Sequence, residues 1–150
     1  MTTAYELAER FIGLREVNGH ADNPAILAML RLDASFPRHD EVPWCSAFVN
    51  YVAWLLRLPR SKSLAARSWL RVGRVISLDE AEPENDVIIL RRGASDAGPE
   101  VRNAPGHVGF FSGLEGDVIH VLGGNQGNSV SVAPYNSARL LGARRLISCS

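Results

Sequence analysis

Two residues that lie far apart in the chain have the types and settings needed for nucleophilic chemistry. Cys45 follows Pro43-Trp44 at the expected first turn of a helix, and His107 follows Gly106 at the expected start of a strand. The free N–H groups and the positive dipole end of a first turn lower the pKa of a thiol and can bind an oxyanion. A nearby imidazole can accept the thiol proton. The pair predicts a cysteine nucleophile with a histidine base, whereas a structural cysteine would more often lie in the middle of a helix, on its apolar face.

A catalytic histidine also needs a third group that orients its ring. The candidates are Asn125 and Gln126, which end the segment Gly123-Gly124-Asn125-Gln126, and His120 on the strand expected just before it. The two glycines would let the chain curl back toward the site, which favours Asn125. His120 and Gln126 are the alternatives, and His120 would need a hairpin turn at about 113–116 to lie beside His107.

The first half of the chain has the hydrophobic periodicity of helices. Thr3 is an expected N-cap, and Asn23-Pro24 has the pattern of an N-cap followed by a first helical residue. Two further helices are expected at about 44–58 and 64–72, the first with a wide apolar face.

The second half has the pattern of strands. Strands are expected at 87–90, 107–111, 118–122, 129–133 and 140–147, with the second and third forming a hairpin. Helices followed by strands predict an α+β fold in which N-terminal helices pack on a C-terminal antiparallel sheet. Because no repeat or linker interrupts the pattern, we expect residues 1–150 to form a single domain.

Composition excludes several classes of partner. The chain has 16 basic and 16 acidic residues, so it lacks the basic surplus typical of nucleic-acid binders. The uncharged apolar run 42–56 is too short to span a bilayer, so we expect no stable membrane insertion. The basic residues between Arg57 and Arg74 are interpreted as a solvated helix face, with a surface for a polyanion such as cell wall as the alternative. The expected state is a monomer.

Three segments resemble motifs of one enzyme family. The segment 43–50 (PWCSAFVN) resembles the nucleophile motif of small CHAP-like and NlpC-like cysteine peptidases, and 106–111 (GHVGFF) resembles their histidine strand. The segment 123–126 (GGNQ) is similar to a loop of the phage and prophage branch. The resemblance implies a papain-like fold and hydrolysis of amide bonds in bacterial peptidoglycan, often as an endolysin. It implies Cys45 as nucleophile and His107 as general base, with no cofactor and no metal.

Other positions carry secondary expectations. Trp44 and Gln126 are expected to contact substrate, and Glu16 and Asp40 to be solvent-exposed or groove acids. Trp54 and Trp69 are expected in the core, with the wall of a groove as the alternative. Cys149 is expected in a frayed tail, without a catalytic role. The first residues lack the features of a secretory signal, so we expect synthesis in the cytoplasm and action on the wall after release through a pore or a secretion machine.

Two other functions remain open from the sequence. One is a zinc-dependent wall amidase with His107, His120 and either Cys45 or His20 as ligands, although no HExxH spacing is present. The other is a non-enzymatic wall-binding module, although such a relative would be expected to lose the cysteine or the histidine.

Overall fold

The helices of the first half begin at the predicted caps. The computed structural model describes residues 1–16, 23–32, 44–93, 98–101 and 104–147. The side chain of Thr3 accepts a hydrogen bond from the Glu6 N–H (3.1 Å), and that of Asn23 accepts one from the Ala25 N–H (2.9 Å). The helices are α1 (Ala4–Glu9), α2 (Pro24–Arg31) and α3 (Cys45–Leu55), with short 3₁₀ helices η1 (Ala66–Arg71), η2 (Leu78–Glu80) and η3 (Ser137–Arg139). Among the described residues, no helix has both the length and the apolar character needed to cross a membrane.

Helix α3 ends about one turn earlier than the sequence predicts. Arg57 has a left-handed backbone (φ 57°), the Arg57 N–H bonds to the Trp54 carbonyl, and the Leu58 N–H bonds to the Ala53 carbonyl. This pair of hydrogen bonds is a Schellman motif, which usually has glycine at the left-handed position. Because arginine occupies it here, the sequence carried no stop signal before Pro59.

Within the described residues the sheet has six strands, all paired antiparallel in the order β1-β6-β2-β3-β4-β5. Its strands are β1 (Arg74–Ile76), β2 (Asp86–Arg91), β3 (Gly106–Glu115), β4 (Val118–Gln126), β5 (Ser129–Asn136) and β6 (Leu140–Arg145). The predicted α+β class and the β3–β4 hairpin are confirmed. The short edge strand β1 was not predicted, because three residues give no periodic signal.

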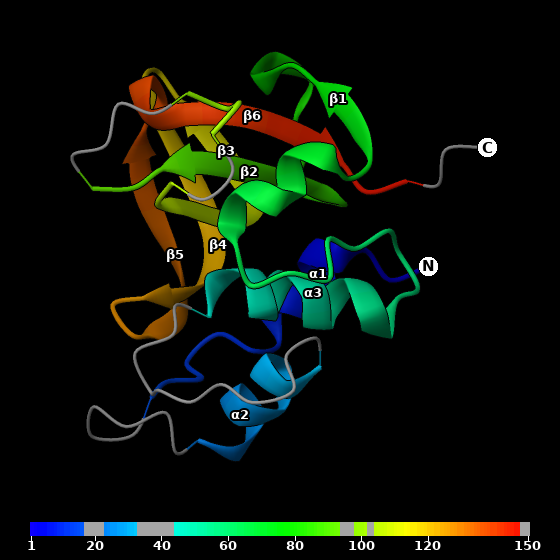
Figure 1. The fold of residues 1–150 in the computed structure, drawn as a ribbon. Helices are drawn as coiled ribbons and strands as arrows, with labels where there is room; N and C mark the ends of the chain where they lie inside the picture. Colours follow the sequence, from blue (N-terminus) through cyan, green and yellow to red (C-terminus); the bar gives the residue numbers. More distant parts are fainter. Residues whose placement is uncertain (17–22, 33–43, 94–97, 102–103, 148–150) are drawn as a thin grey trace.

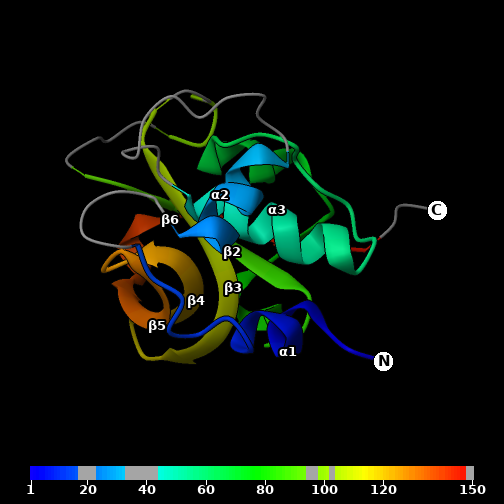
Figure 2. The same ribbon diagram turned by 90° about the horizontal axis from the view of Figure 1, so that it is seen from below.

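Both faces of the sheet are buried. The larger core joins α1, α2, α3 and η1 to one face, and a smaller cluster around Ile88, Phe111 and Val121 fills the other. Figure 1 shows that the strands turn through a large angle between β6 and β5, so the sheet is curled. The helices lie together on the opposite side, where the view from below shows α2 and α3 across β2 and β3 (Figure 2).

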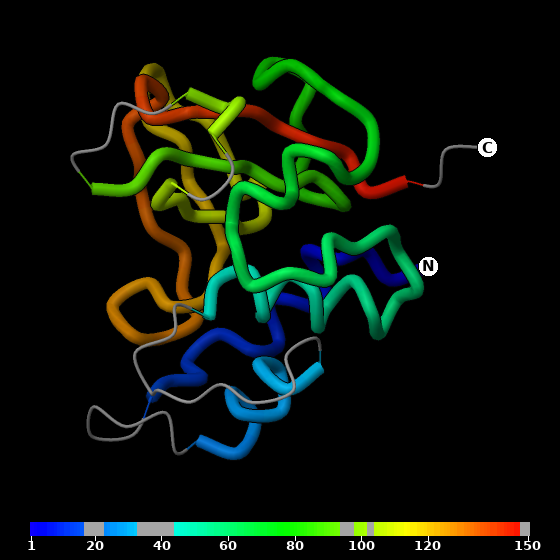
Figure 3. The backbone as a smooth tube through the Cα atoms, viewed as in Figure 1, coloured from blue at the N-terminus to red at the C-terminus, as the bar shows by residue number. Residues whose placement is uncertain are grey.

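Helix α3 is fixed to the following loop by a buried polar network. Asn50 is fully buried, and its amide donates to the carbonyls of Ser46 and Ser63 (both 3.1 Å) while accepting from the Lys62 N–H (3.0 Å). The Ser46 hydroxyl accepts from the indole N–H of Trp69 at 2.9 Å. The network therefore ties the first half of α3, which begins at Cys45, to the 61–63 loop and η1; the tube in Figure 3 follows this path.

Two predictions about the same region turn out differently. Trp69 lies in the core as expected, but Trp54 is 47% exposed, so its core assignment is wrong. Arg67 belongs to the basic run interpreted as a solvated face, yet it is buried and donates to the carbonyls of Gly98 and Pro105. A Cβ on Gly106 would lie 3.0 Å from the Arg67 side chain, so this glycine admits the arginine that holds the chain leading into β3.

Asn50→Ala should lower the free energy of unfolding by about 2–3 kcal/mol, because it leaves several buried polar groups unpaired. Denaturant unfolding measures this. Trp54→Leu, on the same helix but half exposed, is the control and should cost less than half as much. Equal losses in the two variants would show that the network does not hold α3.

Candidate active site

Cys45 is the first residue of α3 and is buried. No side chain caps this helix at Trp44, so the N–H groups of its first turn are available to the cysteine. Backbone N–H groups of Ser46 and Cys45 interact with the thiol from the helix side, and the Val108 N–H interacts with it from β3. Since Val108 follows His107 directly, the start of α3 lies beside the segment of β3 that contains His107.

Burial raises the pKa of the Cys45 thiol above its ordinary value. The N–H groups of Val108, Ser46 and Cys45 and the positive charge of Arg92 all lower this pKa, but they do not outweigh the loss of water. The expectation that the helix start gives a lowered pKa is therefore wrong for the free protein. The helix N–H groups do lower the pKa as predicted, but the tertiary structure buries the sulfur, and this burial has the larger effect.

His107 is buried, and its Nε2 lies 2.8 Å from Oε1 of Gln126. The Gln126 amide is oriented by its own NH₂ group, which donates to the carbonyls of Val121 (3.1 Å) and Ser131 (2.7 Å). An amide oxygen only accepts, so Nε2 of His107 must carry the proton of the neutral ring. Nδ1 is then the basic nitrogen.

Tyr135 completes this arrangement from β5. Its hydroxyl donates to Oε1 of Gln126 at 3.0 Å, and its ring lies against the His107 ring with the centroids 5.3 Å apart. Burial raises the pKa of Tyr135 to about 12, so the phenol stays protonated and remains a donor at neutral pH. Gln126 is thus held at both ends of its amide.

Burial lowers the pKa of His107 to about 4. The hydrogen bond with Gln126 raises the pKa and the charge of Arg92 lowers it, but loss of water is the largest cause. At neutral pH the resting site therefore contains a neutral thiol and a neutral imidazole, an arrangement suited to general-base catalysis.

A backbone irregularity explains why Gln126, and not the favoured Asn125, is bonded to His107. Strand alternation places Ile119, Val121 and Gly123 on the face that carries His107, and Asn125 would be next. The β4–β5 register shifts between Gly123 and Gln126, and Asn125 has a left-handed backbone (φ 59°). This extra residue turns Gln126 toward His107 and leaves Asn125 half-buried on the wall of the neighbouring cavity.

The glycines before Asn125 allow two close contacts. A Cβ on Gly124 would lie 2.6 Å from the Trp44 ring, and one on Gly123 would lie 2.8 Å from Oε1 of Gln126. These distances are too short for any side chain. The glycine pair therefore lets the end of β4 reach both the start of α3 and the His107–Gln126 pair.

Trp44 lies in the core and not in a substrate groove. It is fully buried, and its indole N–H donates to the half-buried Glu16 carboxylate at 2.6 Å. Its predicted substrate contact is not supported, because its ring is enclosed beneath Gly124. Gln126 likewise uses its amide on His107 and the backbone, which leaves it without a free group for substrate. Asp40, His20, His39 and Cys149 lie outside the described residues.

His120 lies away from this site. It pairs with Gly113, six positions after His107 on β3. Its Nε2 is 3.8 Å from the Glu115 carboxylate. The hairpin turn comes at Gly116-Asp117, at the end of the expected span, and the side chain bonded to His107 is that of Gln126 and not that of His120. Within the part of the chain that the structure describes, no three His, Cys, Asp or Glu side chains group to hold a metal.

The chain is similar to a solved structure along nearly its whole length. NlpC1 from Trichomonas vaginalis superposes with a TM-score of 0.56 at 17% sequence identity, covering 95% of this chain and 42% of that one. The chain has a papain-like α+β fold. No family model matches the sequence, and no curated protein sequence matches it either. At this identity the similarity concerns the fold, and the chain spans less than half of the matched structure.

A cavity of about 330 Å³ opens beside His107 in this papain-like fold. Its walls are formed by the ends of β2, β4 and β5 and by η3, through the residues Arg91, Arg92, His107, Asn125, Pro134, Tyr135, Asn136 and Arg139. Sequence reasoning missed Tyr135 and the arginines. Tyr135 could not have been found from the sequence, because its position depends on the β4–β5 register. In that register Tyr135 pairs with Ile119, and the register shifts by one residue nearer the hairpin turn.

The imidazole of His107 should titrate with a midpoint of about 4, observable by NMR of the ring protons. Gln126→Leu should lower the midpoint further, because it removes the hydrogen bond that raises this pKa. Asn125→Ala is the matched control and should leave the midpoint unchanged. A midpoint near the ordinary 6.5, or a shift in the Asn125 variant alone, would contradict the assignment.

Proposed function

We propose that this protein is a cysteine peptidase or amidase that hydrolyses amide bonds in bacterial peptidoglycan, as an endolysin or a related lytic protein. The observation that carries the proposal is the meeting of Cys45, at the start of α3, with the segment that contains His107, itself bonded to Gln126. The papain-like fold supports it, and so does the resemblance of the Cys45 and His107 segments to CHAP-like and NlpC-like motifs.

The first chemical step uses the neutral state of both groups. Nδ1 of His107 accepts the proton of the Cys45 thiol as the sulfur attacks the amide carbonyl. The resulting imidazolium keeps its Nε2–H bonded to Gln126, whose hydrogen bond raises the pKa of His107 and so favours the charged ring. Gln126 thus fixes both the tautomer and the ring orientation.

Negative charge then moves from sulfur to the carbonyl oxygen. The backbone N–H groups at the start of α3 face the sulfur already, and a free helix start can also stabilise the oxyanion. The imidazolium next gives its proton to the leaving amine, and the acyl group remains on Cys45 as a thioester. Water, deprotonated by His107, hydrolyses the thioester and restores the thiol.

The cleaved polymer and the place of action follow from the family resemblance. The wall would be reached after release through a pore or a secretion machine. The neutral overall charge of the chain suits a target other than nucleic acid.

Cys45→Ala should reduce wall hydrolysis at least 1,000-fold while folding is retained, because the first turn of a helix accepts alanine. The measurement is the loss of turbidity of purified peptidoglycan or permeabilised cells, with mass spectrometry of the released fragments. Cys149→Ala is the control and should retain full activity.

A metal chelator should leave the rate unchanged, whereas it would silence a zinc amidase. Hydrolysis that survives in a folded Cys45→Ala protein would refute the proposal. Binding to the wall without any released fragment would favour a wall-binding module.

A further inference from the structure

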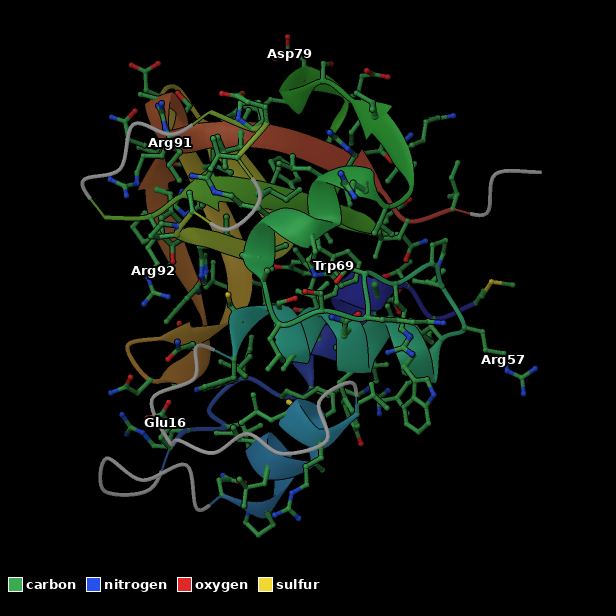
Figure 4. The ribbon with its side chains drawn as sticks, viewed as in Figure 1. Glu16, Arg57, Trp69, Asp79, Arg91 and Arg92 are labelled. Atoms are coloured by element: carbon green, nitrogen blue, oxygen red, sulfur yellow. The ribbon has the colours of Figure 1, made fainter. Side chains whose placement is uncertain are left out.

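The cavity beside His107 has a wall of three arginines on a chain with no net positive charge. Arg91 ends β2, Arg92 follows it, and Arg139 approaches from η3. The chain as a whole has 16 basic and 16 acidic residues, so the three arginines make a local positive region on a chain without net charge. Figure 4 shows Arg91 and Arg92 on the side of the molecule where β5 runs.

Two of these side chains are fixed by backbone carbonyls. Arg139 donates to the carbonyls of Arg91 and Gly93, both at 3.1 Å, and Arg91 donates to the Ala138 carbonyl. These bonds tie the end of β2 to η3 and leave each guanidinium group with donors to spare. In the described ranges, none of the three arginines is paired with a carboxylate.

Arg92 is exposed, and its charge reaches the reacting groups. It lowers the pKa values of Cys45, His107 and Tyr135, so the cavity has a positive potential at the sulfur and at the imidazole. Clustered guanidinium groups without acidic partners repel one another, and a bound anion relieves that repulsion.

We infer that this cavity binds a free carboxylate of the substrate peptide, next to the amide that Cys45 attacks, with Arg92 as its main partner. Arg139 and Arg91 form the rest of the positive wall, and Asn125 and Asn136 offer neutral amides at its edges. The inference rests on the proposed function, since it takes the wall peptide as substrate. It adds a specificity: a peptide whose carboxylate is amidated should be a poor ligand.

The test measures binding without turnover, in the Cys45→Ala protein. Two peptides, L-Ala-γ-D-Glu-L-Lys-D-Ala with the D-Ala carboxylate amidated in both and the glutamate α-carboxylate free or amidated, are compared by calorimetry at low ionic strength. The free acid should bind at least tenfold more tightly, since a guanidinium–carboxylate pair replaces a neutral contact. Adding Arg92→Gln should bring the two affinities within about twofold, and 0.5 M salt should also reduce the preference.

Arg10→Gln is the matched control, because Arg10 is exposed and lies at the end of α1. It should keep the full preference. Equal binding of the two peptides, no binding of either, or a preference that survives Arg92→Gln would overturn the inference. These outcomes are separate from the proposed function, which is judged by Cys45-dependent hydrolysis: hydrolysis without the preference would reject the arginine site alone, and the preference without hydrolysis would reject the enzyme alone.

Discussion

The contact of the first turn of α3 with the start of β3 and the end of β4 is the constraint on which the site depends. On one side the Val108 N–H reaches the Cys45 sulfur, and on the other Gly124 packs on the Trp44 ring. The contact is possible because a glycine faces the indole and because Glu16 satisfies the indole N–H. The helix is held from behind by the network of Asn50, Ser46 and Trp69. Packing on both sides of α3 thus places the Cys45 thiol, on a helix, beside the segment of β3 that contains His107.

The same close packing sets the electrostatics of the site. Excluding water raises the pKa of the thiol and lowers that of the imidazole, so both groups rest uncharged at neutral pH. The groups that would stabilise the charged pair are nevertheless in place: helix N–H groups and Arg92 for the thiolate, and Gln126 for the imidazolium. We therefore expect the thiolate and the imidazolium to form only when a bound substrate is attacked, as the Cys45 proton passes to His107. In this account Tyr135 acts through Gln126, as a donor that keeps the amide oxygen aimed at His107.

Local patterns predicted the fold well, and tertiary geometry accounts for what they missed. The caps at Thr3 and Asn23, and the change from helical to strand periodicity, gave the α+β class, since these signals lie in neighbouring residues. The end of α3 was predicted too late because Arg57 adopts a conformation typical of glycine. The glycine pair favoured Asn125 over Gln126, and the register shift that reverses their positions could not be predicted because it depends on the pairing of β4 with β5. The direction of the Cys45 pKa was wrong because burial by distant segments cannot be derived from helix position.

The most direct test of the account is to trap the acyl group on the protein. Peptidoglycan fragments are mixed with the protein, and the reaction is quenched in acid within milliseconds to seconds. The protein is then digested, and the mass of the peptide that contains Cys45 is measured by mass spectrometry. The account predicts a thioester on Cys45 that is lost on treatment with hydroxylamine and that builds up when deacylation is slowed. Hydrolysis that proceeds with Cys45 unmodified at every time point would contradict it.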